Sequence, residues 1–89
     1  MVKYKVLYSK VALKDAKKLT AARLDQKAKN LIEIIKTDPF KNPPPYKKLV
    51  GHLSGTYSRR INIQHRLVYE VKETDKKIRI LRMWSHYEE

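Results

Sequence analysis

The sequence contains no cysteine, which excludes disulfide bonds and cysteine-ligated metal sites. Its three histidines, His52, His65 and His86, are too far apart along the chain for a familiar metal-ligand pattern, so neither a metal nor another cofactor is expected. No apolar run approaches the roughly 18 residues of a membrane-spanning helix, and nothing resembles a signal peptide. We therefore expect no membrane association and a cytoplasmic location.

Acidic residues are scarce. The chain has 9 acidic and 21 basic residues, a net charge of +12 and an isoelectric point near 10.0, which favours a polyanionic partner, and nucleic acid over a membrane. No acidic residue occurs between Asp38 and Glu70. A length of 89 residues predicts one domain that spans residues 1–89.

The first half of the chain predicts one strand and two helices. Alternating apolar residues at 2–8 indicate the strand. Ser9 and Thr20 each precede a helical pattern and are the expected N-caps, with the second helix running from about residue 21 to residue 37. The expected apolar stripes are Ala12, Leu13, Ala16 and Leu19 in the first helix, and Leu24, Ala28, Leu31, Ile32 and Ile35 in the second. Two helices in tandem are expected to form an antiparallel hairpin.

The second half predicts a sheet. All four prolines lie in residues 39–46, an expected extended connector, and Leu49, Val50 and Leu53 are expected to begin a strand. Apolar alternation on both sides of residues 62–64 predicts a hairpin, and a charged turn at 72–76 leads to a last strand that ends near Trp84. This order of elements is typical of an α+β fold in which the helices cover one face of an antiparallel sheet.

Basic residues on the expected hairpin suggest RNA cleavage without a metal. When a ribose 2′-hydroxyl attacks the neighbouring phosphate, the reaction needs a base, cationic donors for the phosphorane, and an acid for the 5′-oxygen. Arg66 could bind two phosphate oxygens, His86 could donate the proton, and Tyr87 could stack on a base or orient the phosphate.

Simpler interpretations remain open for these residues. Arg66 could form an ordinary ion pair with Glu70, Glu73 or a terminal glutamate, and His86 could be a solvated surface residue. Arg59 and Arg60 are expected on opposite faces of a strand, so only one of them can join Arg66.

Four motifs resemble the YoeB/Txe branch of the RelE-type bacterial toxins. They are Leu53-Ser54-Gly55, Tyr57-Ser58-Arg59-Arg60-Ile61, His65-Arg66-Leu67-Val68-Tyr69 and His86-Tyr87. The resemblance covers nearly the whole chain, including the paired helices and Asp38-Pro39-Phe40.

The resemblance implies a RelE-like fold and the toxin of a type II toxin–antitoxin system. Such a toxin is a metal-independent endoribonuclease that cleaves mRNA in the A site of the 70S ribosome, and a YefM-like antitoxin restrains it. The resemblance leaves open whether the chain forms a homodimer. It implies that Arg66 stabilises the phosphorane, His86 is the general acid and Tyr87 orients the substrate. The expected RNA-binding residues are Lys48, Tyr57, Arg59 and Arg60.

One position departs from the family pattern. The family's general base is a glutamate that precedes the Leu-Ser-Gly motif, and counting back from Leu53 places Lys47 there. A lysine among many cations is expected to be protonated and unable to accept a proton. The sequence therefore predicts an attenuated or inactive enzyme, with a neutral amine base as the less favoured alternative. A non-catalytic inhibitor that occupies the ribosome and a basic structural protein are the other hypotheses.

Overall fold

The computed structural model describes residues 3–43, 45–49, 55–62 and 65–84. Its elements are β1 (Lys5–Tyr8), α1 (Lys10–Ala21), α2 (Asp25–Thr37), β2 (Lys47–Lys48), β3 (Thr56–Arg60), β4 (Arg66–Lys72) and β5 (Lys77–Arg82). The predicted α+β class and the order of strand, two helices and further strands are confirmed. The strand expected to begin at Leu49 is instead the short β2 just before it, and Val50 and Leu53 lie outside the described residues.

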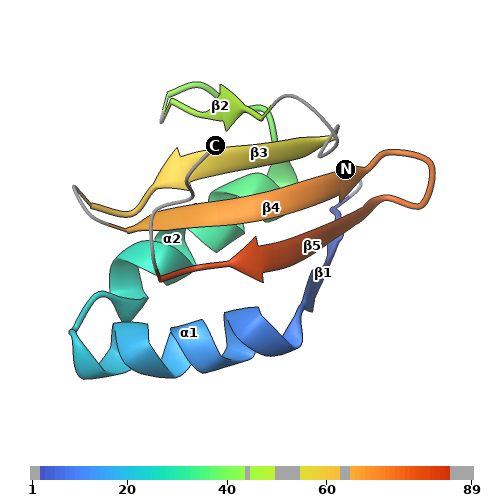
Figure 1. Ribbon diagram of the computed structural model, residues 1–89. Helices are drawn as coiled ribbons and strands as arrows, with labels where there is room; N and C mark the ends of the chain where they lie inside the picture. Colours follow the sequence, from blue (N-terminus) through green and yellow to red (C-terminus); the bar gives the residue numbers. More distant parts are fainter. Residues whose placement is uncertain (1–2, 44, 50–54, 63–64, 85–89) are drawn as a thin grey trace.

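The strands form one mixed sheet in the order β1-β5-β4-β3-β2. Strands β2 to β5 pair in antiparallel fashion, as predicted, whereas β1 pairs in parallel with β5. A parallel pair needs a long connection, and everything from α1 to β4 lies between these two strands in the chain. Figure 1 shows α2 behind the sheet and α1 below β5, with no described helix over the near face.

The start of α1 follows the prediction. The Ser9 hydroxyl accepts a hydrogen bond from the Ala12 backbone N–H at 3.0 Å and donates one to the Leu81 carbonyl at 3.0 Å. Ser9 therefore caps α1 and also joins it to the end of β5.

Thr20 is not a helix cap, which corrects the second prediction. Helix α1 continues through Thr20 to Ala21, and α2 begins later than expected, at Asp25, with no side-chain cap. The Leu24 and Arg23 N–H groups donate to the carbonyls of Leu19 and Thr20, and Arg23 has a left-handed φ of 59°. This pattern is a Schellman motif, which ends a helix through backbone bonds and needs no capping side chain.

The core lies between the helices and the face of the sheet that they cover. The predicted stripe of α2 is buried at Ala28, Leu31, Ile32 and Ile35, and α1 contributes Ala12 and Leu19. These side chains pack with Tyr4, Ile61, Leu67, Tyr69, Ile78, Ile80 and Met83. Leu13, which was expected in the stripe of α1, is 55% exposed, because that stripe passes through Ala12, Asp15 and Leu19 at helical spacing. No helix in the described part of the chain is long and apolar enough to cross a membrane.

The two hydroxyl residues expected as caps should differ in their effect on stability. Ser9→Ala removes the cap of α1 and the bond to Leu81, and we expect it to lower the free energy of unfolding by about 1 to 2 kcal/mol. Thr20→Ala removes only an exposed bond to the Ala16 carbonyl, with an expected cost below about 0.5 kcal/mol. Urea denaturation measures both, and equal costs would contradict the capping assignment.

Candidate functional site

Two arginines lie directly opposite each other on the β3–β4 hairpin. Arg60 is the register partner of Arg66, so both side chains lie on the same face of the sheet. Directly opposed residues of antiparallel strands have Cβ atoms about 5 Å apart, and like charges there repel. The pair therefore forms a ready-made site for an anion.

Arg66 fits this role because none of the described residues neutralises it. Its Nε atom is buried and has no hydrogen-bond partner within that part of the chain. Neither Glu70 nor Glu73 pairs with Arg66 in the described part of the chain. Glu73 instead binds Tyr4 and Lys76. The terminal glutamates lie outside the described residues.

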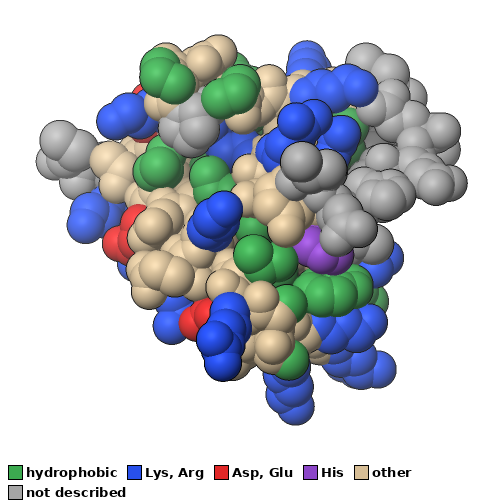
Figure 2. All heavy atoms as spheres, turned by 90° about the vertical axis from the view of Figure 1, so that its left-hand side faces the viewer, with side chains coloured by type: hydrophobic (Ala, Val, Ile, Leu, Met, Phe, Trp, Pro, Cys, Tyr) green, Lys and Arg blue, Asp and Glu red, His purple; other side chains and the backbone are tan. Residues whose placement is uncertain are grey.

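The arginine pair borders a depression with a volume of about 470 Å³. Its described lining consists of Pro45, Tyr46, Lys47, Ser58, Arg60 and Arg66, none of which is acidic. Lys47 reaches the rim because β2 pairs with β3 and places it opposite Ser58. On the side of the molecule drawn in Figure 2, lysine and arginine side chains are widespread and acidic ones are few.

Arg59 occupies the opposite face, as strand alternation predicted. It is only 1% exposed and belongs to the protein interior. Its Nε donates to the Tyr69 hydroxyl at 3.1 Å, its Nη2 donates to the Pro39 carbonyl at 3.0 Å, and its guanidinium lies 5.0 Å from the centre of the Tyr46 ring. The expectation that Arg59 contacts RNA is therefore wrong, since a buried side chain cannot reach a phosphate.

The role of Arg59 is instead to fix the proline-rich connector. The Tyr69 hydroxyl also donates to the Pro39 carbonyl, at 2.8 Å, so both side chains hold the beginning of the connector. Burial raises the pKa of Tyr69, although Arg59 opposes the shift, and Tyr69 therefore remains a neutral donor near neutral pH. These contacts hold the start of the connector, and the contact of Arg59 with the Tyr46 ring lies at its other end, next to Lys47.

Tyr57 belongs to the same buried side. It packs edge-on against Phe40 and Tyr46, with ring centres 5.2 and 5.8 Å away, and lies beside Tyr69 across the strand pair. Alternation along β3 places Tyr57 on the face of Arg59 and away from Arg60. The structure therefore gives Tyr57 a packing role, and its contact with RNA stays a prediction.

The remaining predicted residues separate into two groups. Lys48 is exposed but is not among the residues that line the depression. His52, His86 and Tyr87 lie outside the described residues. The proximity of His86 and Tyr87 to Arg66 therefore stays a prediction. No group of residues that could hold a metal ion occurs in the described ranges.

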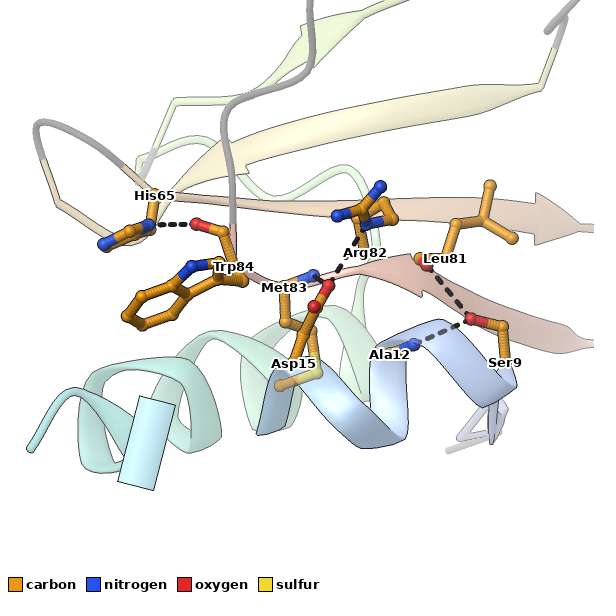
Figure 3. A network of polar contacts seen from close by, with 8 residues as sticks. All are labelled: Ser9, Ala12, Asp15, His65, Leu81, Arg82, Met83 and Trp84. Carbon is orange, nitrogen blue, oxygen red and sulfur yellow. Dashed lines mark hydrogen bonds and ion pairs between the residues drawn. The ribbon is translucent and has the colours of Figure 1, made fainter. Parts of the chain in front are cut away.

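A polar network at the end of β5 was not predicted from the sequence. Figure 3 shows Ser9, Asp15 and His65 in contact with consecutive residues at the end of β5. Asp15 is buried and accepts hydrogen bonds from Arg82 and Met83, while the His65 ring bonds the Trp84 carbonyl. One signal was present in the sequence: Asp15 is an acidic residue at a core-facing position of a helix rich in lysine.

Comparison with known proteins places these features in context. Residues 8–87 match the family model of the YoeB-like toxin of bacterial type II toxin-antitoxin systems. The toxin YoeB of Streptomyces coelicolor is 42% identical over 65 residues, which cover 73% of this chain and 75% of that protein.

Two solved structures from Staphylococcus aureus have the same fold. The YoeB dimer is 32% identical with a TM-score of 0.81, and the YoeB-YefM complex is 31% identical with a TM-score of 0.78. Each covers 96% of this chain and 99% of the matched chain.

Substitutions of the two adjacent arginines should affect different properties, RNA binding for Arg60 and stability for Arg59. Arg60→Ala removes one cation from the depression, and we expect weaker binding of single-stranded RNA, a slope of log affinity against log salt lower by about one, and stability within about 0.5 kcal/mol of the parent. Arg59→Ala breaks the buried bonds to Tyr69 and Pro39, and we expect it to cost at least about 2 kcal/mol. Fluorescence anisotropy and urea denaturation measure the two effects. Unchanged RNA affinity in Arg60→Ala would rule out the depression as the binding site.

Proposed function

The chain belongs to the YoeB-like toxin family of bacterial type II toxin–antitoxin systems. We propose that it is a metal-independent endoribonuclease that acts on mRNA in the ribosomal A site. The single observation that carries the proposal is the opposed pair of Arg60 and Arg66 at the depression, where the buried Nε of Arg66 has no partner among the described residues. Such a pair suits a phosphodiester that gains negative charge in its transition state.

The proposed reaction is an internal transfer within the RNA. The 2′-oxygen forms a bond to phosphorus and loses its proton to a base, while the bond from phosphorus to the 5′-oxygen breaks and that oxygen takes a proton from an acid. The products are a 2′,3′-cyclic phosphate and a 5′-hydroxyl. In this scheme Arg66 and Arg60 stabilise the phosphorane, His86 is the general acid and Tyr87 orients the scissile phosphate.

Lys47 determines how well the chain performs this reaction. Its place on the rim beside the arginine pair is consistent with the position of the family's glutamate base. A protonated lysine cannot take the proton of the 2′-hydroxyl, although it adds a third cation for the RNA backbone. We therefore propose that the chain retains RNA binding but has attenuated chemistry.

A second function is favoured by the same lining. None of the described residues around the depression is a carboxylate, so the site has cations for binding and no acidic group to serve as a base. The chain would then inhibit translation by occupying the A site without cutting mRNA. Inhibition by occupancy predicts translation arrest without new RNA ends.

The proposed cellular partners follow from the charge and from the relatives. The net charge of +12 favours an acidic antitoxin of the YefM kind, in keeping with the YoeB-YefM complex of the S. aureus relative. We expect part of that antitoxin to cover the basic depression. A homodimer is proposed by analogy with the dimer of the same relative, with the 70S ribosome and mRNA as the targets.

Primer extension on programmed ribosomes tests the role of Lys47. Lys47→Glu places a carboxylate beside Arg60 and Arg66, and we expect it to raise the cleavage rate at least about tenfold, since a general base contributes roughly 10² to 10⁴ in rate. Lys48→Glu makes the same change of charge at the neighbouring exposed position and is the matched control, for which no gain is expected.

The same assay separates the two functions. The enzymatic proposal expects His86→Ala to abolish the cleavage gained by Lys47→Glu. Translation arrest that persists in His86→Ala, with no new RNA ends in any variant, would replace it with inhibition by occupancy. An equal gain from Lys48→Glu would show that net charge, and not a base at position 47, controls the rate.

A further inference from the structure

The chain from Leu81 to Trp84 is held by side chains from distant parts of the sequence. Ser9 donates to the Leu81 carbonyl, Asp15 accepts from Arg82 and Met83, and His65 contacts Trp84. Figure 3 shows these contacts side by side along the end of β5. Consecutive residues are thus fixed immediately before the segment that carries His86 and Tyr87.

Asp15 makes the most demanding of these contacts. It is 2% exposed, and its Oδ2 atom accepts from the Met83 backbone N–H at 3.0 Å and from the Arg82 Nε at 3.2 Å. A bond to a backbone N–H fixes the path of the main chain, which an ordinary ion pair between side chains does not. A buried carboxylate is expensive unless it is paired and hydrogen-bonded, and among the described residues Asp15 meets both conditions only through Arg82 and Met83.

His65 provides a second, independent contact. Its ring stacks on Trp84 with centres 4.1 Å apart and an interplanar angle of 22°, and its Nδ1 bonds the Trp84 carbonyl. His65 also immediately precedes Arg66 in the chain. It therefore links the strand that bears the phosphate-binding arginine to a residue two positions before His86.

Covalent geometry limits the distance that can separate residue 86 from Trp84. Two residues of chain span at most about 7 Å, so the position of Trp84 bounds the space within which residue 86 can act. Acid catalysis requires the donor within hydrogen-bond reach of the leaving oxygen, and a displacement of about 1 Å can cost two orders of magnitude in rate.

We propose that Asp15 and His65 are positioning residues for the terminal general acid. Asp15 holds the backbone of Met83 and His65 holds Trp84, and together they fix the point from which the chain continues to His86. Neither residue is proposed to contact the substrate. The catalytic consequence rests on the proposed function of His86, whereas the anchoring of Trp84 does not.

Trp84 is the only tryptophan of the chain and reports on the anchoring directly. In the Lys47→Glu background, Asp15→Ala and His65→Ala are expected to increase the quenching of Trp84 fluorescence by acrylamide. They are also expected to lower kcat at least about tenfold, while KM on programmed ribosomes changes less than about twofold. Asp25→Asn, an equal change of charge at the start of α2 and away from residues 81–84, is the control and should change none of these quantities.

Conservative variants keep the test decisive if an alanine variant does not fold. Asp15→Asn retains an acceptor for the Met83 N–H but loses the charge that faces Arg82, and His65→Phe retains an aromatic ring but loses the bond to the Trp84 carbonyl. Intermediate losses of kcat, with urea unfolding showing a fully folded protein at the assay temperature, support the proposal.

Unchanged quenching together with unchanged kcat in folded Asp15 and His65 variants overturns the proposal. A fall in stability alone, without the change in kcat, also overturns it and leaves a structural role. If no variant cleaves RNA, the proposed function fails, and the fluorescence of Trp84 alone supports or overturns the anchoring.

Discussion

The constraint on which the site depends is the repulsion between Arg60 and Arg66. Two guanidinium groups at directly opposed positions of a strand pair destabilise the sheet unless an anion lies between them. The other face of the same hairpin offsets this cost, because Leu67 and Tyr69 are fully buried in the core against the helices. Alternation along the two strands thus places Leu67 and Tyr69 in the core and the opposed arginines on the other face, at the depression.

The adjacent residues Arg59 and Arg60 illustrate this separation. They have the same chemistry and neighbouring places in the chain, yet one is buried between Tyr69 and the Pro39 carbonyl and the other borders the depression. The buried arginine still serves the site indirectly, since it fixes the connector that leads to Lys47. A cluster of basic residues in a sequence therefore cannot be read as a set of equivalent phosphate contacts.

The connector, helix α1 and the end of β5 are distant in sequence but lie around the β3–β4 hairpin. The connector brings Lys47 to one side of the arginine pair, while Asp15 and His65 anchor the end of β5 that leads to the terminal histidine. In the proposed site, the lysine at the rim adds a cation at the position where the family resemblance implies a carboxylate. Binding and chemistry are thus uncoupled in this proposal, because they depend on different residues of the same depression.

By itself, the sequence determined the α+β class, the two helices, the hairpin and the opposite orientation of Arg59 and Arg60, because these follow from local periodicity and alternation. It was misleading at Thr20, where backbone bonds alone end α1, and at Leu13, whose exposure depends on the exact orientation of the helix. Only the tertiary structure decided that β1 lies parallel to β5, that Arg59 is interior and that Asp15 holds Met83. These facts depend on contacts between residues far apart in the chain, for which a single sequence has no local signal.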